Sequence, residues 1–285
     1  MMKRWIPLAM CALALGCGGD ESAPAGAGEA PQAEAPAPNT PATPPKTFDA
    51  ATLKADAETI ALVPSPAEME KALSTAGIDA KLGDMIADRD ISMDVENKDQ
   101  IAVRTGVVLA DLVLTVKEAE KDQILARLGK LKEGFEKLGA GTDIQATIDE
   151  LATQITNDAI SREKLLQEMD ELSGVMVPEL EYEAGEWVVP LIHAGSWLEG
   201  AHLVSGALKA GGSYDAADSM LKQPAVVDYF IKYVNREGNE KAPDEVVKRL
   251  QETLSTLKEV ASKPTLGAEE VETIHSSTGA VLTML

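Results

Sequence analysis

Cysteine, histidine, aromatic residues and positive charge are all scarce in this chain of 285 residues. The only cysteines are Cys11 and Cys17, there are three histidines, and aromatic residues make up 4% of the chain. Because both cysteines lie at the extreme N-terminus, the remainder of the chain forms no disulfide and binds no zinc through cysteine. Leucine, valine, isoleucine and alanine must therefore supply most of the core.

The shortage of positive charge argues against one class of partner. Acidic residues outnumber basic residues by 47 to 26, and the formal net charge is −21. A surface of this sign repels phosphate backbones, so we expect no nucleic-acid binding. Solubility is the simplest explanation of the charge, and recruitment of cations or of a basic partner is the alternative.

The N-terminal hydrophobic run is too short to cross a bilayer as a helix, which takes about 20 apolar residues. It covers Trp5–Leu15 and follows the positive residues Lys3 and Arg4. A short positive segment followed by an apolar run of this length is typical of a secretory signal. The sequence therefore predicts a signal peptide over residues 1–16.

The end of that run, Leu13-Ala14-Leu15-Gly16-Cys17, resembles the lipobox of bacterial lipoproteins, in which small residues precede a cysteine. The resemblance covers about the first 20 residues. It implies that Cys17 receives a diacylglyceryl group and becomes the mature N-terminus. Cys11 is a poor rival because the bulky Met10 precedes it. In such lipoproteins an Asp directly after the cysteine is associated with the inner membrane, so Gly18 at this position implies the outer membrane. An ordinary cleaved signal is the alternative.

A change of composition marks a tether over residues 17–46. This segment is rich in alanine, proline and glycine and contains no aromatic residue. It cannot bury enough surface to offset the entropy of ordering, so we expect it to be disordered. Proline-rich chains extend by about 3.1 Å per residue, which gives a reach on the order of 80–90 Å. The tether would hold a domain well clear of the membrane.

The remaining residues, 47–285, predict one acidic, all-α, multi-helix domain. Apolar residues recur three and four apart through most of this region, and no alternating pattern predicts a strand. Helix caps are predicted at Ser65, Thr142 and Ser161, and further helix starts at Ser213, Pro224 and Pro243 and after Thr265 or Gly267. Helix ends are predicted at Gly139 and near Gly238.

Two long apolar helices, 101–117 and 187–209, are each followed by amphipathic ones. They share a Gly three residues before a Leu, at Gly106 and Gly195. This spacing suggests two weakly similar halves, and a common packing requirement explains it equally well.

Two of the three histidines belong to Glu-x-x-His units. Glu199 precedes His202 and Glu272 precedes His275, each by three residues, so each pair shares a helix face. Ferritin-like di-iron proteins use two such units, completed by a glutamate from each of two other helices. Metal binding is therefore one interpretation. Chance is the simpler one, because glutamate is abundant in this sequence.

Four further residues are candidates for a ligand site or for packing. His193 and Trp197 lie on the second long apolar helix. Arg104 and Asp111 lie seven residues apart on the first, and so share a stripe of its surface. Packing is the simpler interpretation for all four. No nucleophile elbow, phosphate-binding loop or histidine-containing hydrolase motif is present.

These features predict an outer-membrane lipoprotein whose helical domain lies in the periplasm or on the cell surface. We expect the domain to bind a protein, a peptide or an envelope component without catalysis, and to carry no cofactor besides the lipid on Cys17. The alternative is a ferritin-like metal-binding protein. A deep pocket containing His193 or the pair Arg104 and Asp111 would instead point to an enzyme.

Overall fold

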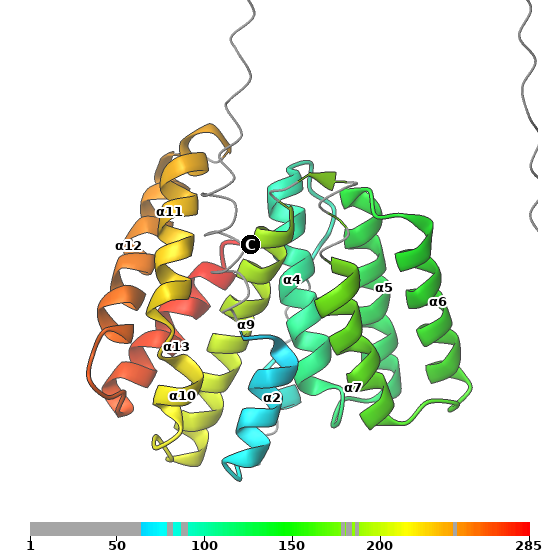
Figure 1. The fold of residues 1–285 in the computed structure, drawn as a ribbon, viewed down its shortest axis with the longest axis horizontal. Helices are drawn as coiled ribbons and strands as arrows, with labels where there is room; N and C mark the ends of the chain where they lie inside the picture. The colour runs from blue at the N-terminus through cyan, green and yellow to red at the C-terminus, as the bar shows by residue number, and fades with distance from the viewer. Residues whose placement is uncertain are drawn as a thin grey trace, which may run out of the picture. The chain divides into compact units, whose positions relative to one another are not determined.

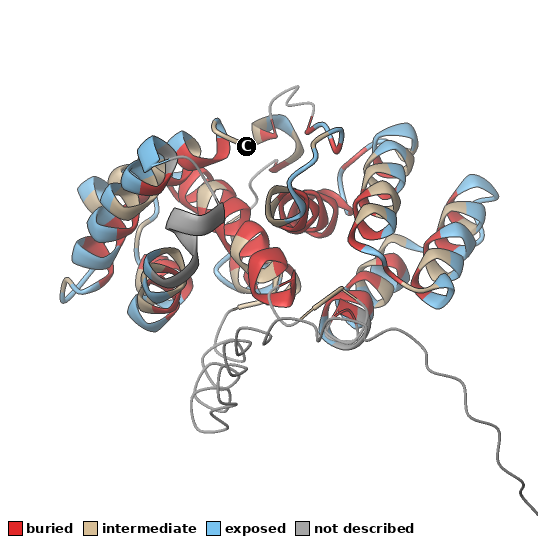
Figure 2. Ribbon diagram, turned by 90° about the horizontal axis from the view of Figure 1, so that it is seen from above, coloured by how far each residue is buried: buried red, intermediate tan, exposed pale blue. Residues whose placement is uncertain are grey.

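Two apolar helices, α4 (Lys98–Thr115) and α9 (Val188–Gly211), lie side by side at the centre of the computed structural model (Figure 1). The structure describes residues 64–78, 82–86, 91–177, 180, 184–185, 188–241 and 244–285. Most residues of both helices are buried (Figure 2), as expected for helices that are apolar on all sides. The predicted signal peptide, Cys17 and tether lie outside the described residues.

The other helices are arranged on either side of these two. On the α4 side, α5 (Lys121–Leu138) packs on α4 and α6 (Thr142–Thr156) packs on α5, while α7 (Arg162–Glu171), which is followed by a π-helical segment, Leu172–Met176, contacts α4 and the short helix α2 (Pro66–Thr75). On the α9 side, α10 (Ala217–Leu221) and α13 (Ala268–Leu282) pack on α9, while α12 (Asp244–Ala261) packs on α13 and α11 (Pro224–Lys241) packs on α12. Helix α2 and the short helix α3 (Leu82–Met85) contact both central helices. The described residues contain no strand, which confirms the all-α prediction.

Local capping explains several helix ends as predicted. The Ser65 hydroxyl accepts a hydrogen bond from the Glu68 amide at 3.2 Å, while the Ser65 amide donates to the Glu68 carboxylate at 2.8 Å. The Ser161 hydroxyl likewise accepts a hydrogen bond from the Lys164 amide and so caps α7. Pro190 lies in the first turn of α9, where its missing N–H would have no partner within the helix.

Three predicted helix ends were wrong by a few residues. α10 begins at Ala217 and not at Ser213, because the chain first makes a turn after the positive-φ Gly212. Thr142 is the first residue of α6, and Gly141 takes the capping position. α11 continues past Gly238 to Lys241, since a single interior glycine costs a helix only about 1 kcal/mol.

The close crossing of α4 and α9 depends on one glycine from each helix. A Cβ atom added to Gly106 would lie 1.9 Å from the carbonyl oxygen of Ile192. A Cβ atom added to Gly195 would lie 2.0 Å from the carbonyl oxygen of Val103. The two backbones are therefore in direct contact. The similarity between the two apolar helices follows from this shared contact and needs no internal repeat to explain it.

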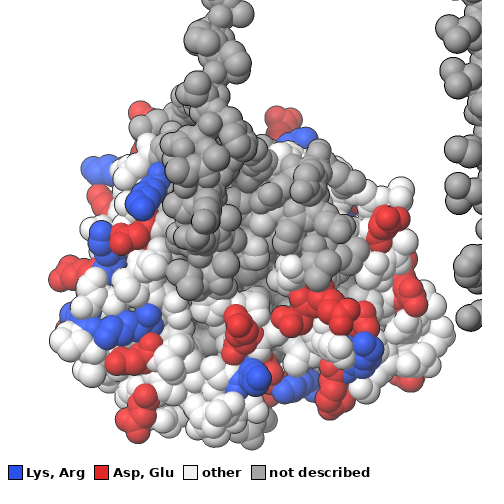
Figure 3. Space-filling model, viewed as in Figure 1, with Lys and Arg blue, Asp and Glu red and all other residues white. Residues whose placement is uncertain are grey.

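Acidic and basic side chains are interspersed on the face shown in Figure 3. The described surface visible there carries no extended basic patch.

Candidate functional site

A cavity of about 460 Å³ lies between α3, α4 and α5. Ile86, Ile91 and Val108 give it an apolar part. The full lining consists of Gly83, Asp84, Ile86, Ile91, Val108, Asp111, Gln123, Ala126, Arg127 and Lys130. Small-molecule sites in proteins have volumes of roughly 300–1,000 Å³ and combine apolar walls with a few polar groups. The volume of this cavity falls in that range, and five of its ten lining residues are polar or charged.

Asp111 is the most deeply buried polar side chain of the cavity wall. It is 4% exposed because the rest of α4 around it is apolar. A buried carboxylate needs hydrogen-bonding or charged partners, and Asp111 is engaged by other groups of the protein. A ligand in the cavity would thus meet a carboxylate whose position is already fixed.

One face of α5 supplies the polar residues opposite Asp111. Gln123, Arg127 and Lys130 are spaced by four and then three residues, which places them on one stripe of the helix. The Lys130 ammonium donates to the carbonyl of Ile91 at 3.0 Å and so helps to position the segment before α4. The sequence analysis missed this face, although the spacing of its residues was a usable signal.

Arg104 does not accompany Asp111 in the cavity wall. Its guanidinium donates to the backbone carbonyl of Ser92, and its side chain is nearly buried. Burial lowers the pKa of Arg104 from its ordinary value. The position of Arg104 on α4 therefore serves to hold the segment that precedes the helix, and only Asp111 of the predicted pair lines the cavity.

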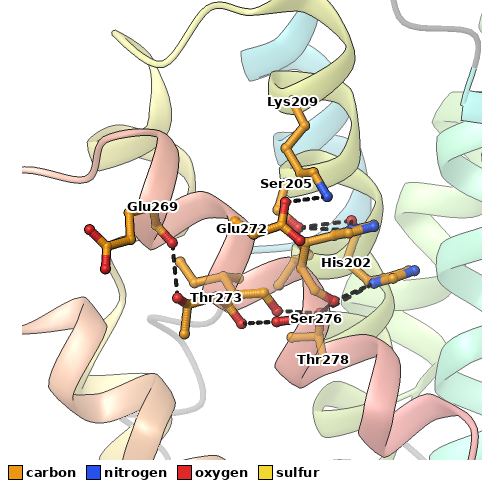
Figure 4. Close-up of polar contacts among 11 residues, drawn as sticks. His202, Ser205, Lys209, Glu269, Glu272, Thr273, Ser276 and Thr278 are labelled. Atoms are coloured by element: carbon orange, nitrogen blue, oxygen red, sulfur yellow. Dashed lines mark hydrogen bonds and ion pairs between the residues drawn. The ribbon is translucent and has the colours of Figure 1, made fainter.

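The two histidines of the Glu-x-x-His units meet at the contact between α9 and α13 (Figure 4). The rings of His202 and His275 are stacked, with centroids 4.2 Å apart and planes 4° from parallel. Nδ1 of each ring lies 3.0 Å from the backbone carbonyl oxygen of the other histidine. The contact is thus reciprocal: each helix presents the same groups to the other.

A longer repeated motif explains this reciprocity. Residues 199–206 and 272–279 both have the pattern Glu-x-x-His-x-x-Ser/Thr-Gly. Each glycine lies under the opposing ring: a Cβ atom on Gly206 would be 3.2 Å from Cε1 of His275, and one on Gly279 would be 2.9 Å from Cε1 of His202. The sequence analysis recognised the Glu-x-x-His part and missed the Ser/Thr-Gly part, which makes the close packing possible.

This geometry does not bring the predicted metal ligands together. The lone pair of each Nε2 lies in the plane of its own ring, and parallel planes share no point at which one ion could bind both. Glu272 forms an ion pair with Lys209 at 2.5 Å, and Glu199 is fully buried. The described residues contain no group of three or more His, Cys, Asp or Glu side chains suited to a metal ion. Metal content itself stays a prediction.

His193 and Trp197 have packing roles in the described part of α9. Trp197 is 3% exposed and contacts Phe230 of α11, with ring centroids 5.5 Å apart. His193 is half-buried, and desolvation lowers the pKa of its imidazole. Neither residue lines the cavity between α3, α4 and α5.

Replacing His193 by glutamine should flatten the pH dependence of stability. An unfolded histidine has a pKa of about 6.5, and the folded pKa of His193 lies below its ordinary value. As pH falls through this interval, the unfolded state takes up the proton first, so the free energy of unfolding decreases. Thermal unfolding between about pH 7.5 and 5 should show a smaller loss in His193→Gln than in the wild type. An equal loss of stability between these pH values in the two proteins would contradict a lowered pKa of His193 in the folded state.

No protein-family model matches this chain, and neither a curated protein nor a solved structure matches it. None of the helices that the structure describes is long and apolar enough to span a membrane.

Proposed function

We propose that this protein is an outer-membrane lipoprotein, anchored through Cys17, whose helical domain binds a small ligand without catalysis. The lipobox-like N-terminus supports the anchor, and the proline-rich segment supports a domain held away from the membrane. The domain faces the periplasm or the cell exterior. Its ligand is a peptide, a segment of a protein or another envelope component that fits the cavity between α3, α4 and α5.

The observation that carries this proposal is the cavity and its lining. It combines an apolar part with acidic side chains, Asp84 and Asp111, and basic side chains, Arg127 and Lys130. A ligand with both an ammonium and a carboxylate group matches such a lining, because each charge finds its counterpart. Short peptides have this chemistry and a suitable volume.

Filling the cavity should weaken ligand binding while leaving the fold intact. Ala126 is an exposed residue of α5 in the cavity lining, so Ala126→Phe places a ring at the opening. We expect dipeptides and tripeptides that raise the unfolding temperature of the mature wild-type chain to bind Ala126→Phe at least about tenfold more weakly, measured by titration calorimetry.

The matched control is Ala146→Phe. Ala146 is also exposed on a neighbouring helix, α6, but does not line the cavity. This variant should bind the same peptides as the wild type does. Equal weakening in both variants, or binding that Ala126→Phe leaves unchanged, would contradict a ligand site in this cavity.

A further inference from the structure

The reciprocal contact between α9 and α13 fixes where the protons of its two histidines lie. A backbone carbonyl oxygen only accepts hydrogen bonds, so an Nδ1 atom 3.0 Å from it must carry the hydrogen. In the neutral pair, His202 and His275 are both protonated at Nδ1. The next proton that either ring takes up must therefore bind at Nε2.

The hydroxyl groups beside the rings are compatible with the same assignment. The Ser205 hydroxyl donates to the carbonyl of Ala201 at 2.6 Å, and the Thr278 hydroxyl donates to that of Ile274 at 2.7 Å. Their oxygens lie 3.4 Å from Nδ1 of His275 and 3.3 Å from Nδ1 of His202, respectively, where they accept and do not donate. Each Nδ1–H is thus directed at oxygen acceptors on the opposing helix.

We propose that His202 and His275 form a proton-sensitive clasp, which holds α13 on α9 while at least one of the two rings is neutral and loosens when both are protonated. One imidazolium stacked on a neutral ring keeps both Nδ1–H donors in place. Two imidazolium rings with centroids 4.2 Å apart repel each other.

The packing around the rings converts this repulsion into a movement of helices. Each ring lies against the glycine of the opposing helix, so closely that no Cβ atom would fit between them without a shift. The rings cannot slide toward those backbones, because the contacts are already tight. Repulsion is therefore relieved by separating α13 from α9.

Two carboxylates lie one helical turn from the rings. Glu272 precedes His275, and the hydrogen bond from Lys209 lowers the pKa of Glu272, so this carboxylate stays ionised in mildly acidic solution. Lys209 balances most of its charge, and His275 interacts with it more weakly. Glu199 lies one turn before His202 and is fully buried. From α3, the side chain closest to Gly206 is the uncharged Met85. With three histidines in the whole chain, few other groups ordinarily titrate between pH 5 and 8.

Hydrogen exchange of the α13 amides tests the clasp in the mature full-length chain. After correction for the intrinsic pH dependence of exchange, protection of α13 relative to α5 should fall at least about tenfold between pH 7.5 and 5 in the wild type. In His202→Gln and in His275→Gln this protection should fall less than about twofold, because only one ring of the pair can become positively charged. His193→Gln is the matched control and should behave at α13 as the wild type does.

Two outcomes would overturn the proposal: α13 protection that is independent of pH in the wild type, or an undiminished fall in both single-glutamine variants. A second measurement needs no variant. Nitrogen-15 NMR of the histidine rings at about pH 8 should show both His202 and His275 protonated at Nδ1. A proton on Nε2 of either ring at this pH would equally refute the clasp.

Discussion

Gly106→Ala should destabilise the domain by about 3 kcal/mol or more, a large fraction of the stability of a typical domain. The added methyl carbon would lie 1.9 Å from the carbonyl oxygen of Ile192 and 2.9 Å from the amide nitrogen of Ser196. Both atoms belong to the backbone of α9, so no side-chain rotation can relieve the clash. The helices must move apart, and the contacts of the most buried part of the core weaken together.

The same reasoning applies to the other side of the crossing. Gly195→Ala would place a methyl carbon 2.0 Å from the carbonyl oxygen of Val103, and we expect a similar loss. Because both substitutions widen one crossing, the double variant should lose less than the sum of the two single losses. Each single variant should unfold about 6–12 °C below the wild type in calorimetry.

Gly129→Ala is the matched control for these variants. Gly129 is exposed near the middle of α5, and a Cβ atom there would meet nothing within 4 Å. Alanine should stabilise this helix by about 0.5–1 kcal/mol. Unfolding temperatures of Gly106→Ala and Gly195→Ala at or above that of the wild type would show that the two backbones are not in direct contact.

Cys17→Ala should abolish fatty-acid attachment completely. Only a thiol at the cleavage point can receive the diacylglyceryl group that the lipobox-like sequence implies, and the mature domain has no other cysteine. In bacteria grown with labelled palmitate, the wild-type protein should carry label and fractionate with the outer membrane. Cys17→Ala should carry no label and should not be cleaved in front of residue 17, as measured by mass spectrometry.

Cys11→Ala separates lipidation from a general effect of losing a thiol. Cys11 lies inside the apolar run of the predicted signal peptide and would be removed with it. This variant should be labelled, cleaved and localised as the wild type is. Label on Cys17→Ala, or a wild-type protein without label, would exclude the lipoprotein assignment. Neither result would bear on the cavity or on the clasp.

Most helix ends were predictable because they depend on neighbours in the sequence. The Ser65 and Ser161 caps, the stop at Gly139 and the start of α13 after Gly267 all involve residues within a few positions of one another. The error at Ser213 has the same origin. Ser213 lies outside any helix, and a turn at residues 215–216 precedes helix α10, which starts at Ala217.

The candidate sites were predictable only in part. Asp111 was a candidate site residue because it is charged and lies on an apolar helix, and it lines the cavity. Its supposed partner Arg104 instead binds a backbone carbonyl twelve residues earlier in the chain. Backbone partners leave no signature in a sequence, because every residue has a carbonyl group. The stacking of His202 on His275 was hidden for a related reason: the two residues are 73 positions apart.

The sequence by itself determined the all-α class, most helix boundaries and the features that predict a lipid anchor, because local periodicity, capping and the N-terminal pattern encode them. The tertiary structure alone decided which faces meet. It placed Gly106 against the backbone of α9, formed an open cavity lined largely by side chains of three helices, and turned two Glu-x-x-His units into a stacked pair with parallel rings. Those outcomes depend on the distance and angle between helices, which the packing of many side chains sets together.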